Sequence, residues 1–432
     1  MNEDSRKEPN PDPVEDPLEQ SRLSAVSRVF YVRIPAFVSL LRREQMWVHS
    51  FRTASPSTIS PFGCSRAMFL MVLMMTLFFM PTAHAACHWE IPQDPPGDST
   101  STTGKWTEVR GALHDAKTER CIRRGISFLV EKQNGVGAFS STYPVAVTAL
   151  SGLALLGAGA EFGSGPDGQA LEKAVDYLIS PIRSNDRGYL EDRGESRSRM
   201  HGHSYAILFL SQVIGQVPTP QREEQIRKVI RSGVKLILSC QTKLGGWGYD
   251  PSDPLDEASL TVCCLQALRS AKEAGVNVPK GTIDRALEYL RQCATEDGTF
   301  RYSLTRSRNR TSYEITAASI STMDAAGEYT LEERKRGMEY IRRLIEKGAR
   351  TRKGAFHVAD NFPFYGNFYT GQILQQSRGE LWNVWSRSVW PQIVKLQKDT
   401  GSWESRYGEE YATAMALLIL ELPLGYLPLY DR

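Results

Sequence analysis

Residues 241–268 read QTKLGGWGYDPSDPLDEASLTVCCLQAL, a glycine-tryptophan turn followed by a nearly continuous apolar stretch. Just upstream, VIRSGVKLILSCQ carries apolar residues three and four positions apart with a basic opposite face, which is typical of a half-buried helix. Downstream, EASLTVCCLQALRSA is apolar on more than one face, which is typical of a fully buried helix. The segment therefore predicts a hairpin of one amphipathic and one buried helix.

The same unit recurs along the chain. A glycine followed closely by an aromatic residue marks each turn, and these aromatic residues lie between 47 and 58 residues apart, the period of helix-pair arrays. The turns lie at 137–139, 188–189, 246–247, 298–300, 354–356 and 401–403. An amphipathic helix precedes each turn and an apolar helix follows it, so the sequence predicts six hairpins.

Such an array must bury its apolar layer inside its amphipathic layer, and closing it on itself removes its apolar ends. We therefore expect an all-α domain at 115–425 with two concentric rings of helices. The N-termini of the inner helices should surround a central cavity at one face. An open solenoid is the alternative arrangement.

The composition fits a globular protein with a sizeable core, since 41% of residues are hydrophobic and 23% are charged. The formal net charge of +3 is nearly balanced, and nothing in it calls for a nucleic-acid partner. Residues 1–66 are polar and lack an apolar period, which predicts a disordered or misannotated extension. Residues 86–114 are rich in Pro, Gly, Ser and Thr, which predicts a linker.

Between these segments, residues 67–85 contain the uncharged run AMFLMVLMMTLFFM and then a small-x-small pattern. This is typical of a cleaved signal peptide, because a spanning helix needs about 20 apolar residues. The sequence thus predicts export to the periplasm or the extracellular space. Retention as a signal anchor, or lipidation of Cys87, is the alternative and would tether the protein to a membrane. Six cysteines follow the run and permit disulfides, although four of them lie in apolar helical patterns typical of buried thiols.

Three turns share a tighter pattern of Gln, Gly and an aromatic residue, at 133–139, 241–247 and 397–403. This pattern resembles the QxxxGxW repeat of squalene and hopene cyclases, which protein-prenyltransferase β subunits share in weaker form. The resemblance is sharpest at 245–268, which is similar to the C-terminal half of the cyclases. It implies the α/α toroid of the terpenoid-cyclase and prenyltransferase superfamily, with the repeated Gln and aromatic residues in structural roles: Gln133, Phe139, Gln241, Trp247, Gln397 and Trp403.

The chemistry of that superfamily is not evident here. Cyclases that protonate an alkene use a DxDD motif, because neighbouring carboxylates and hydrogen bonds make a carboxylic acid a strong proton donor. The sequence has no DxDD, and its nearest acidic cluster is Asp250, Asp253 and Asp256. These are the candidate catalytic acids. The competing interpretation is structural, with Asp256 as a helix N-cap and Glu257 favouring the positive end of the same helix.

The zinc site of protein prenyltransferases is not evident either. It needs an Asp-x-Cys pair and a later His, and the sequence shows no such set. We therefore predict no metal and no cofactor.

Two further groups are candidates for ligand binding. His201 and His203 stand at the start of an inner helix and so near the cavity mouth, although helix-start hydrogen bonding is the competing interpretation. Tyr365 and Tyr369 belong to an aromatic-rich region that would line a pocket or pack the core. Basic runs, such as Arg306, Arg308 and Arg310, are typical of solvated loops, with contact to an anionic surface as the alternative.

Three functions follow. The favoured hypothesis is an exported binding or scaffold protein that uses its cavity or rim for an apolar ligand, a glycan or a protein partner. The second is an isoprenoid-acting enzyme, cyclase-like or prenyltransferase-like, in which the acidic cluster supplies a proton and aromatic faces stabilise a carbocation. The third is a hydrolase or lyase of polysaccharides, which needs two carboxylates at a suitable separation.

Overall fold

The computed structural model describes residues 115–180, 187–192, 195, 199–306, 310–377 and 379–424. The predicted extension, signal segment and linker, with Cys87, lie outside the described residues, as does Arg308. The chain divides into two compact units at Asp98, and the described residues all belong to the second unit. Among the described residues, twelve α-helices form six hairpins, as the sequence predicts.

In each hairpin the first helix is amphipathic and the second is apolar. The first helices are α5 (Ala116–Lys132), α7 (Gly165–Ile179), α9 (Pro220–Ser239), α11 (Lys280–Cys293), α13 (Glu332–Ala349) and α15 (Glu380–Leu396). The second helices are α6 (Pro144–Gly157), α8 (Arg199–Gln212), α10 (Ala258–Glu273), α12 (Tyr313–Ala325), α14 (Pro363–Ser377) and α16 (Glu409–Glu421). Four short elements were not predicted: the antiparallel strands β1 (Phe300–Arg301) and β2 (Thr311–Ser312), and the 3-10 helices η2 (Ala355–Val358) and η3 (Leu422–Leu424).

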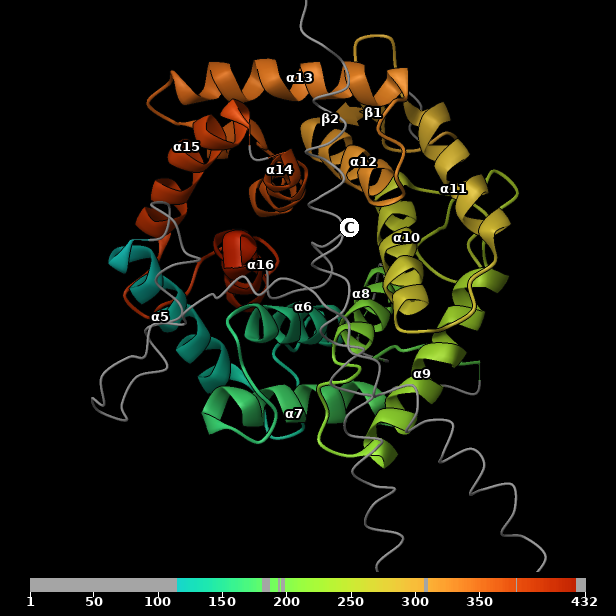
Figure 1. The fold of residues 1–432 in the computed structure, drawn as a ribbon, viewed down its shortest axis with the longest axis vertical. Coiled ribbons are helices and arrows are strands. Elements are labelled where there is room, and N and C mark those ends of the chain that lie inside the picture. Colours follow the sequence, from blue (N-terminus) through green and yellow to red (C-terminus); the bar gives the residue numbers. More distant parts are fainter. Residues whose placement is uncertain are drawn as a thin grey trace, which may run out of the picture. The chain divides into compact units, whose positions relative to one another are not determined.

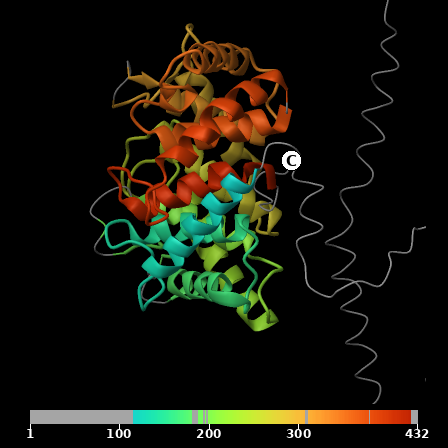
Figure 2. The ribbon, with the colours of Figure 1, turned by 90° about the vertical axis from the view of Figure 1, so that its left-hand side faces the viewer.

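The hairpins close into a double ring (Figure 1). The second helices form the inner ring, where each contacts the next and α16 returns to α6. The first helices form the outer ring, and α15 contacts α5. Figure 2 shows the seam from the side, with the first hairpin in cyan beside the last in red. The closed ring is thus confirmed and the open solenoid is wrong.

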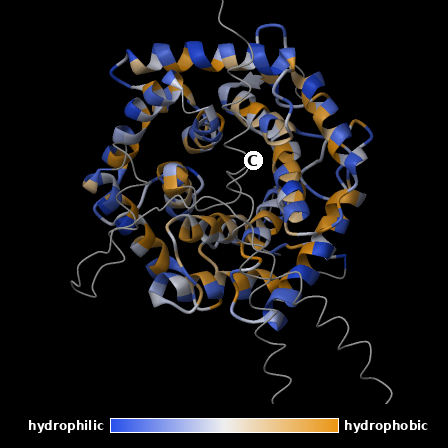
Figure 3. Cartoon of the chain, in the orientation of Figure 1, coloured by the Kyte–Doolittle hydropathy of each residue, from blue (hydrophilic) through white to orange (hydrophobic). Residues whose placement is uncertain are grey.

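Burial explains why the two layers take these places. Every residue of α6 except Ala146 is buried, so this helix can lie only where other helices surround it. The outer helix α13 instead buries only one narrow stripe: Gly337, Ile341, Ile345 and Gly348. Figure 3 shows the outer helices largely hydrophilic away from the centre and apolar toward the inner ring.

The turn glycines let neighbouring hairpins approach closely. Gly245 has a φ of +97°, and a Cβ placed there would lie 2.2 Å from the carbonyl oxygen of Arg285 in the next outer helix. Gly401 repeats this geometry at the seam, where a Cβ would lie 2.5 Å from the carbonyl oxygen of Arg124 in α5. Only glycine satisfies both the left-handed backbone and the contact.

Five cysteines fall within the described residues, and all five are free thiols: Cys121, Cys240, Cys263, Cys264 and Cys293. Four of them are buried in helices, which matches the small-hydrophobe interpretation of their sequence context. Among the described helices, none has the length and apolar character required to cross a bilayer.

Candidate functional site

A cavity of about 290 Å³ opens where the inner helices begin. Every inner helix, or the residue or loop leading into it, contributes to its lining, from Tyr143 before α6 to Tyr411 in α16. A second cavity of about 250 Å³ adjoins it and shares lining residues with it, including Phe362, Tyr365 and Tyr407. The expected central cavity at the N-terminal face of the inner ring is therefore present.

Aromatic side chains line one part of the main cavity wall and aliphatic side chains line another. Tyr143, Tyr407 and Phe362 form a continuous aromatic patch, in which Tyr407 stacks on Phe362 at 6.0 Å and meets Tyr143 edge-on at 6.1 Å. The aliphatic lining residues stand in the first two turns of the inner helices α6 and α12: Ala146, Val147, Leu150 and Ile315. The cavity thus offers a largely apolar surface with phenol hydroxyls on its wall.

A line of three hydrogen-bonding side chains leads from the cavity into the protein. His201 and Ser259 both line the cavity, and Nε2 of His201 lies 3.0 Å from Oγ of Ser259. Ser259 donates a hydrogen bond of 2.6 Å to Oε1 of Glu257, which is fully buried at the N-cap of α10. These contacts connect a cavity histidine to a buried carboxyl through one hydroxyl, a geometry through which a proton can pass.

Burial raises the pKa of the Glu257 carboxyl, because the surrounding helices exclude water. The hydroxyls of Ser259, Tyr302 and Tyr249 oppose that rise in pKa, as does the charge of Arg306. The two tyrosine hydroxyls also hydrogen-bond to each other. Oε2 of Glu257 accepts no hydrogen bond of good geometry from the described residues. The net result favours a carboxylic acid that retains its proton above the usual range.

Two more carboxyl groups line the cavity. Glu314 is buried in the first turn of α12, where its Oε1 accepts hydrogen bonds of 3.1 Å from the backbone amides of Asn361 and Phe362. This contact fixes the loop that carries Phe362. Glu195 is also buried, and burial raises its pKa to about 7 although the backbone amides of Val145 and Ala146 favour its charged form.

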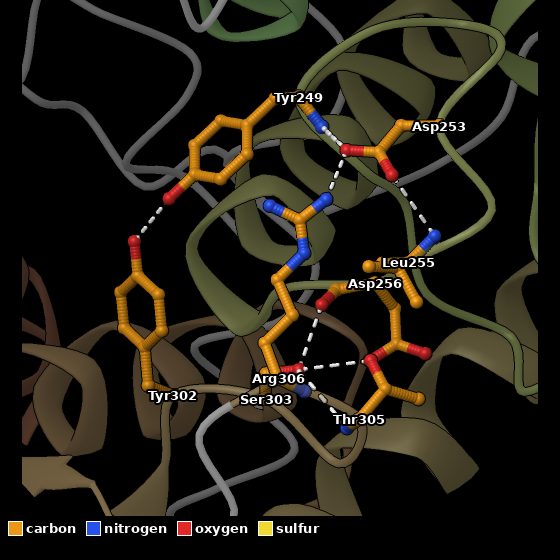
Figure 4. Close-up of polar contacts among 8 residues, drawn as sticks. All are labelled: Tyr249, Asp253, Leu255, Asp256, Tyr302, Ser303, Thr305 and Arg306. Carbon is orange, nitrogen blue, oxygen red and sulfur yellow. Dashed lines mark hydrogen bonds and ion pairs between the residues drawn. The ribbon is translucent and has the colours of Figure 1, made fainter.

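The three predicted catalytic acids lie away from the cavity lining. Asp250 pairs with Arg199 at 2.9 Å, and Asp253 pairs with Arg306. Figure 4 shows Asp253 accepting hydrogen bonds from the Tyr249 and Leu255 backbones, which hold the loop.

The side chain of Asp256 is buried and faces the outer helix α11, where Tyr289 donates a hydrogen bond of 2.8 Å to it. The structural interpretation of Asp256 as the helix N-cap is corrected, because Glu257 occupies that position.

The structure separates the residues predicted to bind a ligand. His201 and Tyr365 line the cavity. His203 is fully buried behind it, where Nδ1 accepts from the Leu190 amide at 3.1 Å and Nε2 lies 3.2 Å from the Gly233 carbonyl. A carbonyl only accepts, so Nε2 carries the proton, and burial lowers the pKa of His203 to about 4. Tyr369 is likewise buried and donates to Gln266.

The repeated glutamines join neighbouring hairpins. Nε2 of Gln241 donates to the carbonyl of Gly245 in its own turn at 2.9 Å and to that of Thr282 in the next outer helix at 3.0 Å. Gln133 does the same toward Gly137 and Ala170.

Gln397 repeats this pair of bonds at the seam, where it reaches Gly401 and the Cys121 carbonyl of the first hairpin. The aromatic partners Phe139, Trp247 and Trp403 are buried beside these turns.

Comparisons with known proteins bear on the fold. No family model matches the chain, and no curated protein matches it either. Among solved structures, the chain is similar to the GH76A alpha-1,6-mannanase from Salegentibacter sp. HEL1_6, with a TM-score of 0.52 at 10% identity over 72% of this chain and 99% of that one. An inactive variant of that mannanase with alpha-1,6-mannotetrose gives a TM-score of 0.53 at 11% identity over 72% and 99%. The type II terpene cyclase MstE from Scytonema gives 0.46 at 12% identity, again over 72% and 99%.

The described domain is an α/α toroid.

The sequence pattern does not single out Ser259, Glu314 or Glu195, which line the cavity. It predicts only a helix-end role for Glu257, which lies buried behind Ser259. A positional signal exists for Ser259 and Glu314, because each is the second residue of an inner helix, where a polar side chain lies near the mouth of the ring. Among the described residues, no group of three or more His, Cys, Asp or Glu side chains is arranged to hold a metal ion.

Proposed function

We propose that the toroid is a binding protein that holds an apolar small molecule in its central cavity. The observation that carries the proposal is the composition of the cavity wall, which combines aliphatic side chains with a connected aromatic patch. A cavity of about 290 Å³ with an adjoining one of about 250 Å³ falls within the size range of small-molecule sites. The signal-like segment at 67–85 supports a further proposal that the protein acts outside the cytoplasm.

Filling the cavity should abolish binding without unfolding the ring. Leu150→Trp and Ile315→Trp place an indole in the cavity from two different inner helices. Each should weaken binding of the neutral fluorescent probe N-phenyl-1-naphthylamine by about tenfold or more, since the indole occupies the ligand's volume. Fluorescence titration of the full chain measures this dissociation constant, and thermal unfolding verifies the fold of each variant.

Leu244→Trp is the matched control, because Leu244 is exposed in a turn outside the cavity. Mass spectrometry of organic extracts from the purified protein would identify a bound natural ligand. Titration with mannotetraose tests the glycan alternative. Failure of the wild-type protein to bind any apolar probe, or equal binding by both cavity-filling variants, would contradict the proposal.

One observation favours a second candidate, an acid–base enzyme acting on an isoprenoid or similar apolar substrate. The line from Glu257 through Ser259 to His201 ends in the cavity, and the acid at its buried end has a raised pKa. For an outward relay the Ser259 hydroxyl must turn from Oε1 of Glu257 to an unprotonated Nε2 of His201 and accept the carboxylic O–H of Glu257. The O–H bond of Glu257 and the original O–H bond of Ser259 then break as a new O–H bond forms at Ser259 and an N–H bond forms at His201, so the positive charge appears on the cavity wall.

Glu257→Gln should stop such chemistry while keeping ligand binding. The full chain would be incubated in D₂O with geranylgeraniol or squalene, and deuterium bound to carbon would be measured by mass spectrometry. We expect the variant to lose about a hundredfold or more of the wild-type labelling rate, because the amide cannot supply a proton. Glu332→Gln is the control, since this carboxylate is exposed on the outer helix α13 and pairs with Lys335. A wild-type protein that binds the probe but leaves the substrates unlabelled would contradict the enzyme and favour the binding protein.

A further inference from the structure

We propose that the cavity mouth recognises the anionic headgroup of an amphipathic ligand, with Arg310 and Arg406 as the headgroup-binding residues. The inference deepens the proposed function and rests on it, because it specifies the class of ligand for the same cavity. The ligand's apolar tail would lie against Val147 and Leu150, and its charged oxygens would stay at the mouth.

Three arginines lie on aromatic rings at this mouth. The guanidinium carbon of Arg306 is 5.2 Å from the ring centre of Tyr249, that of Arg310 is 4.7 Å from Tyr302, and that of Arg406 is 4.3 Å from Phe362. All three rings line the main cavity. Arg310 lines the main cavity itself, and Arg406 lines the adjoining one. Positive charge is therefore held at the entrance by ring contacts.

Among the described residues, a carboxylate pairs with one of the three arginines. Arg306 forms an ion pair with Asp253. Arg406 donates a hydrogen bond of 3.2 Å to the carbonyl of Asn361, which carries no net charge. No carboxylate of the described residues forms an ion pair with Arg310 or Arg406. A guanidinium that stacks on a ring still directs its N–H groups outward in its own plane, which leaves them available to an oxyanion.

The carboxyl groups around the mouth form their contacts with groups other than Arg310 and Arg406. Oε1 of Glu314 accepts two backbone amides. Glu404 lines the adjoining cavity but pairs with Lys398 at 2.9 Å. Burial raises the pKa of Glu195 to about 7, so this carboxyl carries only part of its charge near neutrality. Arg310 and Arg406 are therefore the cationic groups of the mouth with which no carboxylate of the described residues pairs, and their N–H groups suit a carboxylate or a phosphate monoester.

The test compares three ligands with the same tail: dodecanol, dodecanoate and dodecyl phosphate, each below its aggregation limit. The full chain is titrated by displacement of N-phenyl-1-naphthylamine, and the readout is the ratio of anion affinity to alcohol affinity. We expect the wild-type protein to bind at least one anion about tenfold more tightly than the alcohol, and added salt to reduce this preference. The carboxylate and phosphate arms identify which headgroup is preferred.

Arg310→Met and Arg406→Met keep an unbranched apolar stem but remove the guanidinium and its charge. Each should lower the anion-to-alcohol ratio by about threefold to tenfold and leave dodecanol affinity within about twofold of wild type. The double variant Arg306→Met with Asp253→Asn is the matched control, because it removes a ring-stacked arginine together with the carboxylate that neutralises it and so leaves the net charge and the expected ratio unchanged.

The outcomes separate the two proposals. If the three ligands bind equally well, or if the double control variant lowers the ratio as much as Arg310→Met and Arg406→Met do, the headgroup inference is overturned while apolar binding stands. If none of the three ligands displaces the probe and the probe itself does not bind, the proposed function fails and takes the inference with it.

Discussion

Trp403→Ala is expected to lower the free energy of unfolding by about 3–5 kcal/mol, the usual cost of deleting a buried large aromatic side chain. Trp403 is fully buried, and its Nε1 donates a 2.7 Å hydrogen bond to the Ile393 carbonyl. Its ring also lies against α5, since a Cβ at Gly125 would be only 3.0 Å from it. Deleting the ring therefore opens a cavity at the joint between the last and first hairpins. Urea unfolding monitored by circular dichroism measures the loss.

Trp247→Ala provides the comparison, because Trp247 makes the same bond at 2.8 Å to the Ile237 carbonyl in an interior hairpin. In a closed ring the two variants should lose similar stability. Trp403→Phe should cost less, about 1–2 kcal/mol, since it removes the hydrogen bond but keeps most of the ring. A Trp403→Ala loss far smaller than that of Trp247→Ala would mean that the seam contributes little to folding.

Glu421→Gln is expected to make the protein more stable than wild type by more than about 1 kcal/mol at pH 8, and nearly equal to it at pH 4. Glu421 ends α16 with 1% exposure, and neither carboxyl oxygen has a hydrogen-bond partner among the described residues. Burial alone raises its pKa well above the usual value.

The folded-state pKa of Glu421 exceeds the unfolded one. Its contribution to stability is therefore complete below the unfolded pKa of about 4.3 and is lost as pH rises toward the folded pKa.

The measurement is urea unfolding of both proteins from pH 4 to pH 8. Glu195 and Glu257 also have raised pKa values and add a slope of the same sign, so the quantity of interest is the difference between variant and wild type. Glu410→Gln is the control, because Glu410 stands at the partly exposed start of the same helix. A difference that does not grow with pH would show that Glu421 is solvated in the folded protein.

The fold was predictable because its determinants are local and repeated. Each outer helix carries its own apolar stripe, and each inner helix is buried on nearly all of its faces. Each turn also contains a glycine with a left-handed backbone. The short strands β1 and β2 were not predictable, because two residues are too few to show an apolar alternation. Ring closure could be predicted only because it removes the exposed apolar ends of the array. No local pattern shows it, since the contact between α16 and α6 joins segments far apart in the sequence.

The site was predictable only in part, because orientation is decided by tertiary packing. His201 and His203 are indistinguishable in sequence, yet residues two apart on a helix point in different directions. One reaches the cavity and the other bonds Gly233 of α9. The acidic cluster shows the same problem: Asp256 faces α11 and its neighbour Glu257 is directed toward Ser259. Neither composition nor spacing states which of two adjacent carboxyls faces inward.

The glutamine at the seam has a topological consequence. Gln397 bonds the first hairpin through the same two carbonyl contacts that Gln241 makes between interior hairpins. The two ends of the described body also lie together, since Glu119 of α5 and Leu424 line one surface groove. A short linker between these ends, with a new break in the loop between α12 and α13, would preserve every helix-to-helix neighbour. The order of the hairpins along the polypeptide is thus one of several circular permutations that encode the same architecture.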